Sequence, residues 1–523
     1  MGRVNTIQSY PEAGGMPINQ FMHQLYEQSL KHENIAYSEN GAKMYGTTGK
    51  ALLDLNFSVA SLRDSSPEFI LEKFVAAANE DFTLALKWIF YARDVREGLG
   101  EVRLFSIVMS YLINYHHWKV RAIIPLIPMY GRWDDLMVLL DTRAESDILS
   151  IISKQWHADT IAMKLKQPIS LMAKWLPSIN ATSLDNRKKA LRILRYLNMT
   201  PGQYRHYLNR FRRYLDVVEV KMSERRWDEI DYSKVPSKAN LLYSKAFLRH
   251  DMDRRSQFIA DVLSGKEKMN AGVVYPHEIV YRYISNSLDK EEMDTLLGIW
   301  ANLPRAEGGD TIVVADGSGS MKRIPSQSSN VRCWDIATAL AIYFAEQLSG
   351  PYNNQVITFS EHPRYVDLRP CKNLFEKVNK MKFYTEVANT NIEAVFDLVL
   401  DTAKTNRLTQ DQLPKNILIL SDMEFDSCAE DSSGRYASSN LFEAISDKYT
   451  AAGYKMPRVC FWNIKGSSGA IPMIKNDLGV ALMSGYSINN VKLVMSGKLD
   501  PYDALLDVLN GERYRNIFPD PTP

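Results

Sequence analysis

The chain has 523 residues, of which 45% are hydrophobic and 24% are charged, and its formal net charge is +2. This composition is that of an ordinary globular protein with room for two or more domains. No apolar run reaches the length of a membrane-spanning helix, and the N-terminus lacks the apolar core of a signal peptide, so we expect a protein without a membrane partner.

The four cysteines, Cys333, Cys371, Cys428 and Cys460, are widely spaced and fit neither a disulfide framework nor a zinc site. They indicate a reducing compartment, and we expect a cytoplasmic protein. The charge is uneven: residues 307–523 hold 22 basic and 26 acidic residues, whereas residues 1–306 hold 41 basic and 35 acidic residues. The first part is therefore the one expected to meet an acidic partner.

Taken in order, residues 1–18 are polar and rich in glycine and proline, which predicts a flexible tail. Residues 19–306 show helical periodicity with almost no strand pattern. A typical start is Ser66-Pro67, where serine caps a helix and proline occupies its first turn. Many helices of medium length with short connections predict an α-solenoid of HEAT-like repeats, although no fixed sequence period is visible.

Within this helical part, residues 186–213 contain nine Lys or Arg residues and no Asp or Glu, interleaved with tyrosines. Guanidinium groups bind phosphates and exposed aromatic rings stack on unpaired bases, so the stretch predicts contact with nucleic acid. The alternative is a solvated helix face, as most charge runs are. With the similar cluster near residue 250, the candidate RNA-binding residues are Lys188, Arg192, Arg195, Arg205, His206, Arg212, Arg249 and His250.

Residues 307–523 alternate between strand and helix patterns after a hinge at Glu307-Gly308-Gly309. This alternation predicts an α/β domain with a doubly wound sheet and helices on both faces. Ligands in such sheets bind at the carboxyl ends of the strands, where the chain has several oxygen-bearing side chains.

A buried strand at 311–315 ends in Asp316, and the glycine loop that follows offers the hydroxyls of Ser318 and Ser320. These oxygens suit a hard cation. Further oxygens come from Thr390, at the start of an amphipathic helix, and from Asp422, directly after a second predicted strand. The five residues are candidate ligands of a divalent cation, with Mg²⁺ expected.

This ordered set, with Thr390 lying 74 residues after Asp316 and Asp422 lying 32 residues after Thr390, resembles the metal-ion-dependent adhesion site of von Willebrand factor A domains. The resemblance implies that Ser318, Ser320 and Thr390 bind the ion directly. It implies that Asp316 and Asp422 act directly or through water. One coordination position would stay open for an anionic oxygen of a protein ligand.

Several stretches of the helical part also resemble the Ro ribonucleoprotein (TROVE) family and its relatives: Arg93–Glu101, Gly131–Leu136, Lys174–Ser178, Phe247–Asp251 and Asn270–Gly272. The resemblance covers roughly residues 40–510. It implies a helical ring joined to a von Willebrand factor A domain, a monomer that binds small non-coding or misfolded RNA, and a binding protein rather than an enzyme.

Two alternatives remain at this stage. The chain could be a protein–protein adhesion module, with the cation binding a partner's carboxylate and the solenoid serving as a docking surface. It could also be a metal-dependent hydrolase using Glu424 and Asp426, but a second metal cluster and an obvious general base are lacking.

Overall fold

The computed structural model describes residues 36–37, 43–44, 46–305, 310–326, 329–360, 362–383, 392–422, 439–465, 480–485, 490 and 500–519. These residues fall into two compact units. We call residues 46–85, 276–281 and 305–508 the sheet unit, and residues 86–275, 282–304 and 509–519 the helical unit. Each unit is described by itself.

The sheet unit contains a six-stranded sheet in the order β5-β4-β3-β6-β7-β8. The strands are β3 (Thr311–Asp316), β4 (Gln355–Phe359), β5 (Tyr365–Asp367), β6 (Asn416–Ser421), β7 (Arg458–Asn463) and β8 (Val480–Ser484). All neighbours are parallel except β5, which pairs with β4 in the antiparallel sense. Every residue of β4, β6 and β7 is buried, as expected for strands covered on both faces. A separate two-stranded hairpin pairs β1 (Ala36–Tyr37) with β2 (Lys43–Met44).

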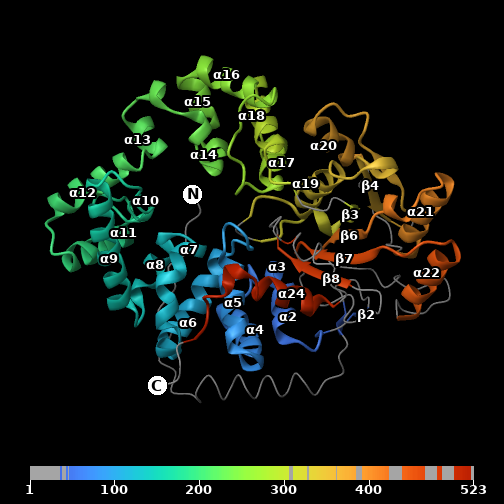
Figure 1. The fold of residues 1–523 in the computed structure, drawn as a ribbon, viewed down its shortest axis with the longest axis horizontal. Coiled ribbons are helices and arrows are strands. Elements are labelled where there is room, and N and C mark those ends of the chain that lie inside the picture. The colour runs from blue at the N-terminus through green and yellow to red at the C-terminus, as the bar shows by residue number, and fades with distance from the viewer. Residues whose placement is uncertain are drawn as a thin grey trace. The chain divides into compact units, whose positions relative to one another are not determined.

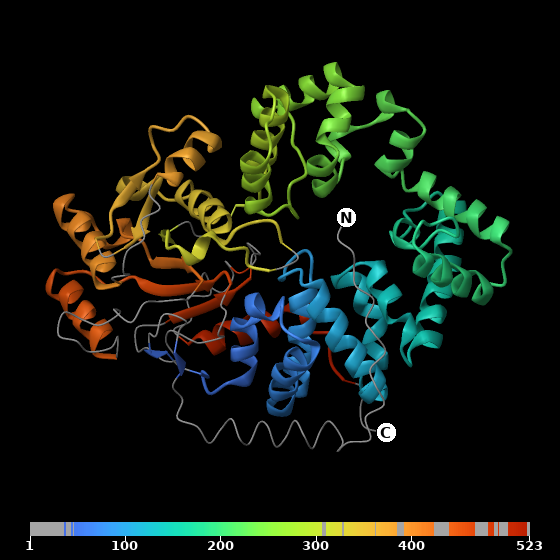
Figure 2. The same cartoon turned by 180° about the vertical axis from the view of Figure 1, so that it is seen from behind.

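The connections wind the sheet in two directions, as predicted. From β3 the chain passes through α19 (Cys333–Ala345) to β4, and it later returns through α21 (Ile392–Thr405) to β6 and through α22 (Ser439–Ala451) to β7. Right-handed crossovers in opposite directions put α19 on one face and α21 with α22 on the other. The last two helices lie next to each other (Figure 1 and Figure 2), where the Tyr449 hydroxyl donates to the carbonyl of Phe396. The other α-helices described for this unit are α2 (Ala51–Phe57), α3 (Val59–Leu62), α4 (Pro67–Glu80), α20 (Leu374–Lys382) and α24 (Pro501–Leu509).

The packing crosses the boundary that the sequence predicts near residue 306. Helices α2 to α4 precede the helical unit in the chain, yet they belong to the sheet unit. The amide of Ala60 donates to the hydroxyl of Ser484 at the end of β8, and Asn463 at the end of β7 donates to the carbonyl of Phe57. A change from helical to alternating pattern marks where the strands begin, but it does not show which earlier helices pack on them.

The helical unit is built from helices that contact their neighbours in the chain, such as α11 with α12 and α15 with α16 (Figure 1). They are α5 (Phe82–Arg93, from residue 86 on), α6 (Val102–Val120), α7 (Ile127–Tyr130), α8 (Trp133–Val138), α9 (Glu145–Lys164), α10 (Met172–Trp175), α11 (Leu184–Tyr196), α12 (Pro201–Tyr214), α13 (Val218–Ser223), α14 (Ser237–Leu242), α15 (Ser244–His250), α16 (Met252–Leu263) and α18 (Lys290–Ala301), while α17 (Pro276–Ser285) is divided between the two units. The helical character of this part is confirmed, whereas the HEAT-like repeat stays a prediction. Among the described helices, none combines the length and apolarity needed to cross a membrane.

Two of the stretches that resemble the Ro family are joined by a buried ion pair. Arg93, at the end of α5, donates from Nε to Oδ2 of Asp135 at 2.9 Å, and both side chains are almost completely buried. The amide of Arg132 donates to the same carboxylate at 2.7 Å. Gly131 makes this approach possible, since a Cβ atom there would lie 2.1 Å from the Asp135 carboxylate. These stretches therefore have a structural role in the helical unit.

Candidate cation site and candidate nucleic-acid interface

The candidate cation site lies at the carboxyl ends of β3 and β6. These strands are adjacent and parallel, with Ala315 opposite Leu420 in the register. From this pair the chain winds outward in opposite directions, which makes it the switch point where doubly wound sheets bind ligands. Asp316 is the last residue of β3 and Asp422 follows β6, so both predicted carboxylates lie at this point.

Three of the described residues of the site, Asp316, Ser318 and Ser320, are connected by short hydrogen bonds. Asp316 accepts the amide N–H of Ser318 at 2.8 Å through Oδ1, and it accepts the hydroxyl of Ser421 at 2.6 Å through Oδ2. The hydroxyl oxygens of Ser318 and Ser320 are 2.9 Å apart. Adjacent ligands of an octahedral ion at Mg²⁺–oxygen distances of 2.0–2.1 Å are separated by about 2.9 Å, so the separation of the two hydroxyl oxygens matches that of two ligands of one Mg²⁺.

Burial gives a second reason to consider a cation here. Asp316 is 4% exposed and Asp422 is 1% exposed. Ionised carboxylates that are removed from water need hydrogen bonds or a compensating positive charge. A divalent cation held by these two carboxylates and the two serine hydroxyls would supply that charge. The donor set present therefore fits a hard cation.

The remaining predictions for this site lie outside the described residues, namely Thr390, Glu424 and Asp426. Within the part of the chain that the structure describes, no group of three or more His, Cys, Asp or Glu could hold a metal ion. The hydroxyls of Ser318 and Ser320 are therefore essential to the candidate site, because the two carboxylates alone are too few.

Sequence reasoning missed Ser421, which is fully buried and donates to Asp316. Its register partners are Asn463 on β7 and, through β7, Ser484 on β8, so a row of buried polar side chains follows the carboxyl edge of the sheet. The signal was present in the sequence: each of these strands ends in a polar residue after an apolar run. The sequence did not show that two residues of this row, Asn463 and Ser484, form hydrogen bonds with α2 and α3.

The candidate nucleic-acid interface lies on α11 and α12, which pack against each other. Of the nine basic residues between 186 and 213, several are exposed and have no acidic partner among the described residues: Arg187, Lys188, Arg195, Arg205 and Arg210. His206, also predicted, is exposed and contacts Tyr207 edge to face. Lys189 and Arg213, by contrast, form ion pairs with Asp185 and Glu224.

Two of the predicted RNA-binding arginines have other partners. Arg212 donates from all three guanidinium nitrogens to α10 and the segment that follows it, reaching the carbonyls of Ala173 and Leu176 and the hydroxyl of Ser178 at 2.8–3.1 Å. Desolvation lowers the pKa of Arg212. Its donors are used within the fold, so Arg212 leaves the candidate set. Arg192 pairs with Asp141 at 2.7 Å, which raises the pKa of Arg192 and reduces its availability to phosphate.

The second predicted cluster lies at the end of α15. Arg249 and His250 are both exposed. The His250 imidazole stacks on the indole of Trp227, with ring centroids 4.5 Å apart and planes inclined by 16°. His250 is the exposed ring of this pair, whereas Trp227 also packs against a hydrophobic cluster.

Comparison with known proteins relates the chain to families without an assigned activity. Residues 310–511 match a domain of unknown function, DUF7788, and residues 181–303 match a second one, DUF2828. Among solved structures, the Ro (RSR) protein of Deinococcus radiodurans aligns over 94% of both chains with 11% identity and a TM-score of 0.33. The SpRpn10 VWA domain aligns over 36% of this chain and 96% of its own, with 10% identity and a TM-score of 0.22. TM-scores of this size do not establish a shared fold, and the resemblance to the Ro family stays a prediction.

One curated relative is similar over nearly its whole length. The uncharacterized protein L728 of Acanthamoeba polyphaga mimivirus is 33% identical over 535 residues, which cover 93% of this chain and 89% of the relative. Identity at this level over nearly the full length of two chains means that this protein belongs to the same family as mimivirus protein L728.

Proposed function

We propose that the protein is an RNA-binding scaffold, and that it binds RNA through the exposed face of α11 and α12. The observation that carries this proposal is the set of five exposed basic side chains, Arg187, Lys188, Arg195, Arg205 and Arg210, without acidic partners among the described residues. Basic side chains on a protein surface are ordinarily interspersed with acidic ones. A phosphate backbone would supply the missing negative charge and release counterions on binding.

Exposed aromatic side chains favour RNA as the partner over a polyanion that has no bases to stack. Tyr196 is 46% exposed at the end of α11. The stacked Trp227–His250 pair offers a platform of the kind on which unpaired bases stack. Basic groups that hold phosphates, combined with rings that hold bases, favour small non-coding or misfolded RNA with single-stranded ends. Nothing in this arrangement requires bond-making, and we propose a binding protein rather than an enzyme.

The test is filter binding of a structured RNA with a single-stranded 3′ tail across a salt series. The variant changes Lys188, Arg195 and Arg205 to Ala, and a matched control changes Lys372, Lys404 and Lys455 to Ala. Losing three phosphate contacts should reduce the slope of log affinity against log salt by about 2–3. The control should keep the slope. Equal slopes for both variants, or no binding at low salt, would overturn the proposal.

We further propose that the site at Asp316 holds Mg²⁺ with Ser318, Ser320 and Asp422. The spacing of the two hydroxyls and the burial of the two carboxylates support this proposal. Bound there, the cation would supply an electrophilic centre that can accept an anionic oxygen.

A partner's carboxylate is the chemical alternative to RNA as the ligand of this site, as in a protein–protein adhesion module. Pull-down with acidic peptides in Mg²⁺ and in EDTA distinguishes the two, since only the adhesion module needs the cation to hold the peptide.

A further inference from the structure

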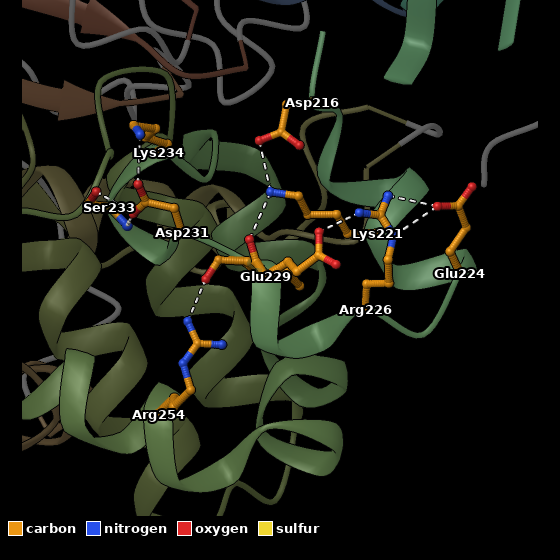
Figure 3. Close-up of polar contacts among 10 residues, drawn as sticks. Asp216, Lys221, Glu224, Arg226, Glu229, Asp231, Ser233, Lys234 and Arg254 are labelled. Carbon is orange, nitrogen blue, oxygen red and sulfur yellow. Dashed lines mark hydrogen bonds and ion pairs between the residues drawn. The ribbon is translucent and has the colours of Figure 1, made fainter. Parts of the chain in front are cut away.

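The helical unit has an open groove of about 650 Å³ between the segment 228–233 and α16. Ile230, Tyr232 and Phe258 form its apolar part, and six carboxylates line it: Asp228, Glu229, Asp231, Asp253, Asp261 and Glu267. The volume lies within the range of ligand-binding pockets. Figure 3 shows the polar contacts around it.

Half of these carboxylates have a basic partner nearby. Glu229 pairs with Arg226, Asp231 pairs with Lys234 at 2.9 Å, and Asp261 lies 3.6 Å from Lys266. The hydrogen bonds from Lys234 and Ser233 lower the pKa of Asp231 to about 2, so this carboxylate is ionised at neutral pH. Asp228, Asp253 and Glu267 are exposed and have no basic partner among the described residues. The groove therefore retains unneutralised negative charge.

The basic residues near the groove do not cancel that charge. Arg254, which belongs to the lining, donates to the carbonyls of Trp227 and Ile230 and pairs with Asp251 at 2.9 Å. Arg255 is fully buried, with its guanidinium carbon 4.9 Å from the Tyr232 ring centroid and 5.5 Å from that of Phe258. The Arg255 charge lies against these two rings. No described ion pair joins it to Asp228, Asp253 or Glu267.

We propose that this groove binds a lysine- or arginine-rich peptide segment of a partner protein. The carboxylates would pair with the cationic heads, while the partly exposed ring of Phe258 would pack against the methylene stems, which long basic side chains bury readily. Such complementarity selects for basic partners and excludes phosphate backbones. The groove is thus distinct from the basic face of α11 and α12, and the proposal does not depend on RNA binding.

The experiment measures fluorescence anisotropy of a labelled hexalysine peptide added to the full chain at low and physiological salt. The groove variant carries the substitutions Asp228→Asn, Asp253→Asn and Glu267→Gln. The control changes Glu68→Gln, Asp447→Asn and Asp503→Asn, which are exposed carboxylates of the sheet unit, so both variants alter the net charge equally. Circular dichroism checks that each variant keeps its fold.

We expect the groove variant to lose affinity by about tenfold or more at low salt and the control by less than about twofold, because only the groove carboxylates contact the peptide. Hexaglutamate should lose no affinity in the groove variant, because it cannot pair with the groove carboxylates. Equal losses in both variants would show that hexalysine responds to overall charge, and this would overturn the proposal. Absence of binding by the wild-type chain at low salt would overturn it as well.

Discussion

Arg513 and Asp94 form an ion pair across 419 residues of sequence, and the Asp94 side chain is completely buried. Asp94 accepts from Nε and Nη2 of Arg513 and from the hydroxyl of Tyr514. Tyr130 completes the contact, since its ring stacks on Tyr514 and its hydroxyl donates to the carbonyl of Arg513 at 2.6 Å. The segment after α24 thereby becomes an integral part of the helical unit.

Removal of this ion pair should destabilise the helical unit strongly. Arg513→Ala leaves a buried carboxylate without its main partner, which costs about 3–5 kcal/mol. The measurement is urea unfolding followed by far-UV circular dichroism. Arg515→Ala is the matched control, because Arg515 pairs with the exposed Glu512 and its loss should cost less than about 1 kcal/mol. Similar losses for the two variants would contradict the assigned role of Arg513.

Gly131→Ala should be nearly as damaging, because the added Cβ would lie 2.1 Å from the Asp135 carboxylate and 3.1 Å from Nε of Arg93. Displacing that buried pair should cost about 3–5 kcal/mol. Gly272→Ala is the control, since an added Cβ there meets nothing within 4 Å. Thermal unfolding of both variants tests the difference, and an unchanged midpoint for Gly131→Ala would refute the close packing.

Ser421→Ala should weaken cation binding if the proposed site at Asp316 is correct. Ser421 orients a candidate ligand through its hydrogen bond without being a ligand itself. Loss of such supporting hydrogen bonds typically costs about 10–100-fold in metal affinity. Calorimetric titration of the EDTA-treated protein with Mn²⁺ and Mg²⁺ gives the readout, and Ser484→Ala at the far end of the polar row is the control. Equal affinities for wild type and Ser421→Ala would count against the positioning role.

Arg255 should tolerate replacement by an apolar side chain of similar length. It is fully buried and donates to Asn240 from Nη1, but Nε and Nη2 have no hydrogen-bond partner in the described structure. Burial lowers the pKa of Arg255 to about 10. Arg255→Met keeps the packing against Tyr232, Phe247 and Phe258 while it removes the unsatisfied donors, so stability should change by less than about 2 kcal/mol. Arg255→Ala leaves a cavity and should cost about 3 kcal/mol or more. Chemical unfolding compares the two, and a greater loss for Met than for Ala would contradict this account.

The sequence was informative where local chemistry decides structure. Ser66 caps α4 with Pro67 in its first turn, as predicted, because both preferences are local. The strands that end at Asp316 and Ser421 were also predicted, since buried parallel strands are continuous apolar runs. Partners at long range were not visible. Arg212 looked like the other basic residues of its helix, and only the fold shows that its donors reach the carbonyls of Ala173 and Leu176.

The ion pair between Arg513 and Asp94 also bears on how the chain is made. Arg513 leaves the ribosome 419 residues after Asp94, an interval of roughly 20–80 s at synthesis rates of 5–20 residues per second. During that interval the helical unit lacks the guanidinium group that pairs with the completely buried carboxylate of Asp94. Its final packing must therefore follow translation of the sheet unit, and nascent chains awaiting residues 512–514 are natural substrates for chaperones.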